Sequence, residues 1–92
     1  MANAVVTIKI MPTSPDVDLT ALEIQIKEKI AKFCGETQTK TEIEPIAFGL
    51  KAIKILFVMD ESKGSTEPLE LEVQGLENVQ SAEITDIRRA LG

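Results

Sequence analysis

The side chains that could carry chemistry in this 92-residue chain are few and widely spaced. Histidine, tyrosine and tryptophan are absent, which removes the commonest general base and most stacking rings. Cys34 is the single cysteine, and we expect a buried or half-buried thiol without a disulfide or metal partner. Asp16 with Asp18, and Asp60 with Glu61, lack the frame of a calcium-binding loop, so solvated or helix-capping carboxylates are expected. The residue types therefore predict neither an enzyme site nor a bound metal or cofactor.

Charge and glycine spacing exclude further classes of function. The five glycines stand too far apart for a loop that cradles phosphate. The formal net charge is -5, and the excess of acidic residues lies in the last third of the chain, which disfavours direct nucleic-acid binding. The apolar run at residues 4–11 contains Lys9 and is too short for a membrane span or an ordinary signal segment. We expect a cytoplasmic protein with a protein partner and no membrane partner.

Two features remain as candidate binding residues. Phe48 is the only aromatic residue in an expected loop, where it lies between Pro45 and Gly49. Such a ring must pack inward or contact a partner, and the residues alone favour inward packing. Arg88 and Arg89 are the only arginines, and strand alternation points them to opposite sides. Solvated tail charges are their simpler interpretation, although an arginine fork also suits carboxylate or phosphate.

Hydrophobic spacing predicts the elements that position these residues in the first part of the chain. Residues 5–11 alternate apolar and polar, which indicates a strand, and two prolines then predict a loop over residues 12–16. Apolar residues recur at helical spacing over residues 19–33, after Asp18 as the expected N-cap and before Gly35. The first part is therefore a strand, a loop and an amphipathic helix.

The second part of the chain predicts three strands and another helix. Residues 36–43 are polar and rich in threonine, which favours an edge strand. Residues 50–59 are apolar on both faces of the expected strand, which favours a central position in the sheet. Residues 44–49 contain Pro45 and Gly49 and should join these strands as a hairpin. A helix should begin near Thr66, with Pro68 in its first turn, and end near Gly75. Residues 79–87 return to strand alternation.

The resulting order is β-α-β-β-α-β in a single domain over residues 1–92. With right-handed crossovers this order predicts an α+β, ferredoxin-like sandwich, in which a four-stranded antiparallel sheet carries two helices on one face. The first and third strands should form its central pair. The other face stays open, and the two-sided apolarity of residues 50–59 suggests cover by a partner or weak self-association there.

A family resemblance begins with seven residues, Pro45-Ile46-Ala47-Phe48-Gly49-Leu50-Lys51. They resemble the Pro-x-x-aromatic-Gly-x-Lys segment of the translation elongation factor 1-beta family. The segment from Met11 to Leu19 and the closing strand from Val79, with its basic tail, are similar to the archaeal form. The resemblance covers essentially the entire chain.

This resemblance implies a guanine-nucleotide exchange factor for elongation factor 1-alpha, the GTPase that delivers aminoacyl-tRNA, and it implies the same fold. The implied partner-binding residues are Pro45, Ile46, Phe48, Gly49, Lys51, Arg88 and Arg89. Phe48 would dock into the GTPase, and a basic residue near the C-terminus would approach its magnesium and phosphate site. Eukaryotic members have a penultimate lysine there, and Arg89 is the better-aligned candidate in this chain. The alternative function is a small-molecule-binding regulatory or oligomerising ferredoxin-like module.

Overall fold

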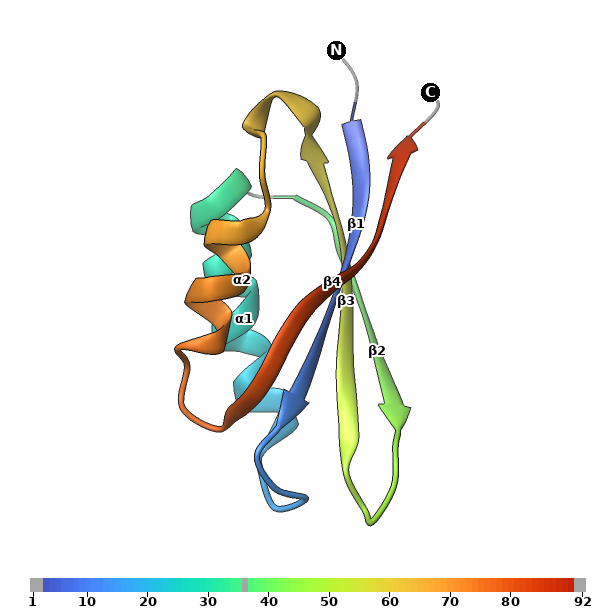
Figure 1. Cartoon of the computed structure of the whole chain (residues 1–92), viewed down its shortest axis with the longest axis vertical. Coiled ribbons are helices and arrows are strands. Elements are labelled where there is room, and N and C mark those ends of the chain that lie inside the picture. Colours follow the sequence, from blue (N-terminus) through green and yellow to red (C-terminus); the bar gives the residue numbers. More distant parts are fainter. Residues whose placement is uncertain (1–2, 36, 91–92) are drawn as a thin grey trace.

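The computed structural model describes residues 3–35 and 37–90, with all their side chains except those of Lys63 and Ala90. The elements in chain order are β1 (Asn3–Pro12), α1 (Leu19–Cys34), β2 (Thr39–Pro45), β3 (Lys51–Asp60), the short 3-10 helix η1 (Glu61–Lys63), α2 (Glu67–Gln74) and β4 (Val79–Ala90) (Figure 1). This is the predicted β-α-β-β-α-β order with η1 added after β3.

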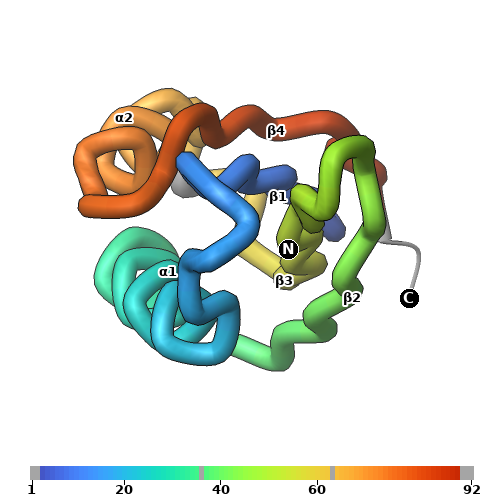
Figure 2. Tube along the Cα trace, turned by 90° about the horizontal axis from the view of Figure 1, so that it is seen from below, coloured from blue at the N-terminus to red at the C-terminus, as the bar shows by residue number. Residues whose placement is uncertain are grey.

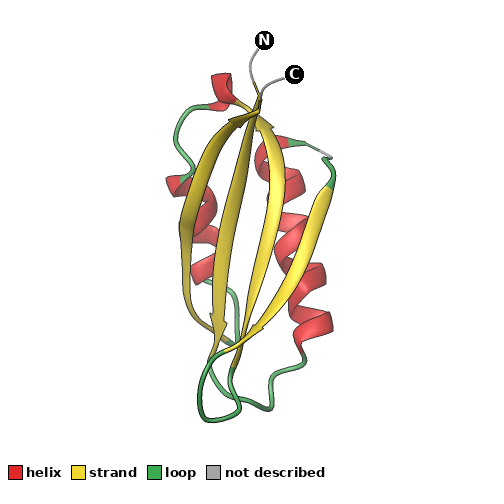
Figure 3. Ribbon diagram, turned by 90° about the vertical axis from the view of Figure 1, so that its right-hand side faces the viewer, coloured by secondary structure: helices red, strands yellow, loops and turns green. Residues whose placement is uncertain are grey.

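The four strands form one antiparallel sheet in the order β2-β3-β1-β4. The two most apolar strands, β1 and β3, lie at its centre as predicted, and they pair Val6 with Phe57 and Ile8 with Ile55. Both helices pack on one face of the sheet (Figure 2), and the opposite face is open (Figure 3). The predicted α+β ferredoxin-like sandwich is confirmed.

The hydrophobic core fills the space between the helices and the sheet. Phe57 is buried in β3, and alternate residues of β1 are buried from Ala4 to Ile10. Each fully buried side chain of this size stabilises the fold by about 1.5–3 kcal/mol. The helices contribute five buried residues, which are Leu22, Ile26, Ile30, Leu69 and Val73. The apolar stripe predicted for α1 therefore faces the sheet, and the two buried residues of α2 face it as well.

The helix ends follow local chemistry. The carboxylate of Asp18 accepts hydrogen bonds from the backbone N–H groups of Thr20 and Ala21, at 3.0 and 3.2 Å. These bonds satisfy donors that the first turn of α1 leaves without a helical partner. After α1, Gly35 takes a φ of 83°, which side chains with a Cβ rarely adopt. Asp18 and Gly35 therefore delimit α1 as the sequence predicts.

The ends of the strands differ from the prediction, by one or two residues in β1 and β3 and by more in β2 and β4. β2 occupies Thr39–Pro45 rather than residues 36–43, because its pairing with β3 begins at Thr39 and continues to the Pro45–Lys51 pair. The weak alternation of this polar segment did not define its ends. β4 continues past Ile87 to Ala90, because β1 pairs with it as far as Asn3.

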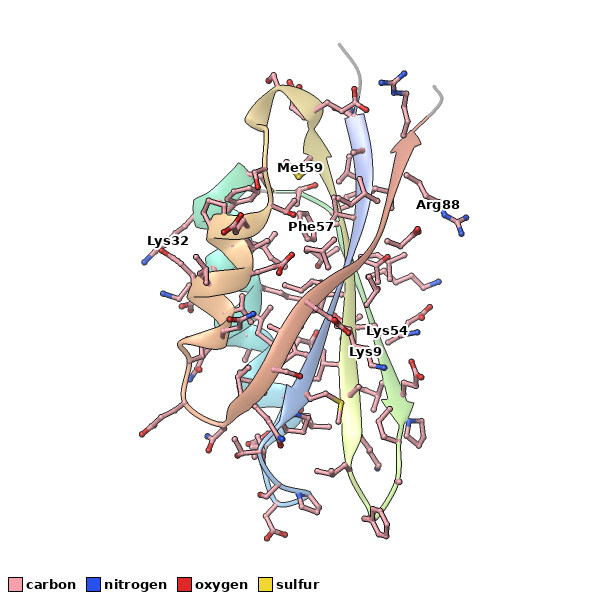
Figure 4. The ribbon with its side chains drawn as sticks, in the orientation of Figure 1. Lys9, Lys32, Lys54, Phe57, Met59 and Arg88 are labelled. Atoms are coloured by element: carbon pink, nitrogen blue, oxygen red, sulfur yellow. The ribbon has the colours of Figure 1, made fainter. Side chains whose placement is uncertain are left out.

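The open face of the sheet is part apolar and part charged. Leu56 and Val58 are half-buried there, while Lys9 and Lys54 point away from the helices (Figure 4). The Nζ atom of Lys54 lies 2.7 Å from Glu44 Oε2. Self-association through this face stays a prediction.

Candidate functional sites at the two ends of the sheet

The hairpin between β2 and β3 ends in a tightly closed loop. The backbone N–H of Ile46 donates to the carbonyl of Leu50 at 2.8 Å, and the N–H of Leu50 donates to the carbonyl of Ala47 at 3.0 Å. Phe48 has a φ of 56° and Gly49 a φ of 79°. Consecutive positive φ values turn the chain sharply, and only glycine adopts them without strain. The loop is therefore held by its own backbone.

Phe48 points into solvent and is 96% exposed, so the inward packing favoured by the residues alone is wrong. The physical reason is the position of the loop, which projects beyond the end of the sheet and past the helices (Figure 1). Ile46 beside the tip is 42% exposed, so two large apolar side chains stand together at this end.

A second segment packs against the hairpin at the same end. A Cβ built on Gly49 would lie 3.7 Å from Pro15 Cβ, so the loop between β1 and α1 contacts the tip closely. A hollow of about 260 Å³ lies between the loop and the hairpin, and Lys51 lines it together with Pro12, Ser14, Pro15, Val17, Leu19 and Gly49. We call this end, formed by residues 12–17 and 45–51, the hairpin surface. The sequence predicts only a loop at Pro15 and does not reveal this contact.

The two arginines lie in the last part of β4. Arg88 pairs with Val5 and Arg89 with Ala4, so the two side chains leave opposite faces of the sheet, as predicted. Arg88 points away from the helices on the open face (Figure 4), and its Nε is 2.8 Å from Asp86 Oδ2. Arg89 lies on the helix-facing side, and its Nε is 3.0 Å from Glu61 Oε1. We call the end formed by residues 61 and 86–89 the tail surface.

A β-bulge decides which arginine takes which face. Ile8 pairs with Ile84 while Thr7 pairs with Asp86, so Thr85 is an extra residue in β4. Such a residue reverses the alternation that follows it. Without the bulge, Arg88 would share the helix-facing side with Ile84. The sequence pattern did not reveal this reversal.

The structure brings the predicted site residues together in two groups rather than one. Pro45, Ile46, Phe48, Gly49 and Lys51 belong to the hairpin surface. Arg88 and Arg89 belong to the tail surface, beside the described ends of the chain. The molecule measures 42 Å along its longest axis, and the two surfaces lie at opposite ends of that axis (Figure 1). A partner that contacts both must extend along the whole sheet.

The charged groups near the hairpin are arranged in ion pairs. The hydrogen bond between Glu44 and Lys54 lowers the pKa of the glutamate and raises the pKa of the lysine. Both groups therefore stay ionised near neutral pH, and their pair ties the base of the hairpin to β3. Cys34 is half-buried as expected, and its thiol contacts the carbonyl oxygen of Ile30 at 3.4 Å.

Among residues 3–35 and 37–90, the side chains form no cluster of three or more cysteine or acidic residues that could hold a metal ion. Within the same residues, neither helix is long and apolar enough to cross a membrane.

Comparison with known proteins identifies the family. Residues 5–90 match the model of the EF-1 guanine nucleotide exchange domain. The chain is 45% identical to Elongation factor 1-beta of Methanothermobacter thermautotrophicus over 91 residues, which is 99% of this chain and all of the relative. It is 46% identical to Elongation factor 1-beta of Methanobrevibacter smithii over 92 residues, again covering 99% of this chain and all of the relative.

A solved structure supports the fold alone. The designed protein Foldit4 has a TM-score of 0.66 and 16% identity to this chain, with 98% of each chain covered. Because the family model spans nearly all of the described residues and the relatives match along their whole length, the chain belongs to the EF-1 guanine nucleotide exchange domain family, and its function is guanine-nucleotide exchange in translation elongation.

Proposed function

We propose that the chain acts as one exchange domain that binds elongation factor 1-alpha with both ends of its sheet and so promotes release of GDP, after which GTP can rebind. The observation that carries this proposal is the 96% exposure of Phe48 on a hairpin closed by its own backbone bonds. Family membership supplies the partner, and the exposed ring supplies a place for that partner to dock.

The hairpin surface provides the anchor. Phe48 and Ile46 present apolar area to water, and large aromatic rings in desolvated pockets dominate the binding energy of many interfaces. Pro45 and Gly49 fix the loop around the ring, and Lys51 adds a positive charge beside the hollow. We assign these five residues to docking rather than to displacement of the nucleotide.

The tail surface provides the group that disturbs the nucleotide site. A guanidinium carries five N–H donors and is charged at every physiological pH, so it suits phosphate oxygens and the carboxylates around a magnesium ion. Arg89 takes the role of the basic residue near the C-terminus of the family pattern, and Arg88, on the open face, contributes to docking. Contacts of Arg89 would weaken the hold of the GTPase on magnesium and phosphate.

The mechanism follows from linkage and needs no covalent step in this chain. If the exchange factor lowers the affinity of the GTPase for GDP, then GDP lowers the affinity for the exchange factor by the same factor. Each tenfold change requires about 1.4 kcal/mol of coupling, which a few desolvated contacts can supply. GDP therefore leaves faster from the complex than from the free GTPase.

The decisive experiment measures release of fluorescently labelled GDP from elongation factor 1-alpha of the same organism. Catalytic amounts of the chain should accelerate release when excess unlabelled nucleotide is present. An unrelated ferredoxin-like protein of similar charge is the control. Release at the intrinsic rate under saturating concentrations of the chain would refute the proposed function.

A further inference from the structure

Arg89 is held by an ion pair that spans 28 positions of the sequence. Its Nε donates to Glu61 Oε1 at 3.0 Å, with 69% of the arginine side chain and 35% of the glutamate side chain exposed. The backbones of both residues belong to ordered elements. Arg89 is paired with Ala4 in the sheet, and Glu61 begins η1, where the carboxylate of Asp60 accepts a hydrogen bond from Ser62 N at 2.9 Å. The pair therefore joins β4 to the segment that follows β3.

This contact leaves the two terminal nitrogens of the guanidinium open. The carboxylate of Glu61 meets the Nε side of the planar fork, and within the described residues Arg89 forms this one ion pair. Its two terminal nitrogens can therefore donate to oxygens outside the chain. A long side chain fixed at one nitrogen also loses less rotamer freedom when a partner binds it.

We propose that Glu61 is a positioning residue for Arg89 in nucleotide exchange. The inference rests on the proposed function, in which Arg89 approaches the magnesium and phosphate site of the GTPase. Glu61 holds the arginine by its Nε and directs the terminal nitrogens outward before docking. An exposed ion pair is weak, so it can orient the side chain without preventing it from shifting onto a phosphate.

The neighbouring arginine offers a matched comparison. Arg88 is also held through its Nε, at 2.8 Å, but by Asp86 on its own strand and on the open face. Replacing Glu61 or Asp86 by alanine removes the same charge from the same end of the molecule. A difference in GDP release between these two variants therefore depends on where the carboxylate lies and not on the net charge.

The test measures GDP release from elongation factor 1-alpha as a function of the concentration of each variant. Glu61→Ala should lower the maximal release rate about two- to fivefold, the range expected for loss of one exposed ion pair, and leave the half-saturating concentration unchanged. Glu61→Gln keeps an oxygen that can accept from Arg89 Nε, so it should recover part of the loss. In an Arg89→Ala background, Glu61→Ala should have no further effect.

Asp86→Ala serves as the control and should have the same effect with or without Arg89. Equal effects of Glu61→Ala in both backgrounds would overturn the inference, because Glu61 would then act independently of Arg89. Faster release by Glu61→Ala would also overturn it, since Glu61 would then compete for the arginine. A normal rate for Arg89→Ala would refute the tail role in the proposed function as well, whereas a normal rate for Glu61→Ala alone refutes only this inference.

Discussion

Phe48 combines two costs that an ordinary loop residue avoids. Its positive φ is a conformation that costs a non-glycine residue on the order of 1 kcal/mol or more, and its ring is almost fully hydrated. Glycine at the same position would carry neither cost. The ring therefore contributes to binding rather than to folding, and its removal should lower the affinity for the partner without lowering the stability of the fold.

We expect Phe48→Ala to weaken binding to elongation factor 1-alpha by about 2 kcal/mol, roughly 30-fold, with little change in melting temperature. Titration calorimetry and thermal unfolding measure the two quantities. Phe48→Gly is the matched control, because it removes the ring and also the backbone strain, so it should raise the melting temperature while losing the same affinity. A large fall in melting temperature for Phe48→Ala would instead assign the ring to the fold.

Arg89→Ala should slow exchange far more than it weakens docking, because its contacts lie where the nucleotide is destabilised. Arg88→Ala should matter less, since Arg88 leaves the opposite face of the sheet. Release rates with magnesium and with a chelator separate the effects, and the advantage of wild type over Arg89→Ala should shrink once magnesium is absent. Equal, small effects of both variants would show that the two arginines are solvated charges without a specific role in exchange.

At the scale of elements, a polar contact ties α1 to the edge strand β2. The carboxylate of Glu23 lies 2.9 Å from Lys27 Nζ and accepts a hydrogen bond from the Thr41 hydroxyl at 2.8 Å. The bonds from Lys27 and Thr41 lower the pKa of Glu23 below its ordinary value of 4.5. The folded state therefore binds this proton more weakly than the unfolded state does.

The resulting stabilisation is present above a pH of about 4.5 and is lost as the pH falls through the lowered pKa of the folded state. We expect Glu23→Gln to reduce the free energy of unfolding near pH 7 by less than about 1 kcal/mol, and the difference from wild type to be smaller near pH 3. Chemical denaturation at the two pH values measures it. Thr41→Val should reproduce part of the loss, and a difference that is independent of pH would contradict the assignment.

Most of the fold could be predicted because its signals are local. Alternation in β1 and β3, helical spacing in α1 and the cap at Asp18 each depend on residues a few positions apart. The ends of β2 could not be predicted, because a polar edge strand takes its limits from pairing with β3. The extra residue Thr85 was invisible for the same reason, since a bulge is defined by the register of two strands.

The candidate sites were predictable as residue types but not as geometry. The resemblance pointed to Phe48 and Arg89 together, while the residues alone favoured an inward ring and solvated arginines. The direction of the ring depends on where the hairpin projects relative to the helices. The ion pair of Arg89 with Glu61 joins residues 28 positions apart, and no pattern in the sequence marks it.

At the scale of the whole molecule, the two surfaces should contribute independently. They lie at opposite ends of a body 42 Å long, much farther apart than the roughly 7–10 Å within which substitutions usually couple. We therefore expect the losses of binding free energy for Phe48→Ala and for Arg88→Ala, the arginine assigned to docking, to add in the double variant within about 0.5 kcal/mol. Calorimetry on all four proteins measures the cycle. A double variant no weaker than Phe48→Ala alone would show that Arg88 contacts the partner only after the hairpin has docked.

The pairing of Asn3 with Ala90 places both described ends of the chain beside the tail surface. Any tag, fluorophore or surface tether attached to either terminus therefore joins the described part of the chain beside the tail surface, and far from Phe48. A sensor that immobilises the protein through its N-terminus would display the hairpin freely while crowding the arginines. Kinetic assays should accordingly use untagged protein, whereas pull-down assays through a terminal tag would report mainly on docking by the hairpin.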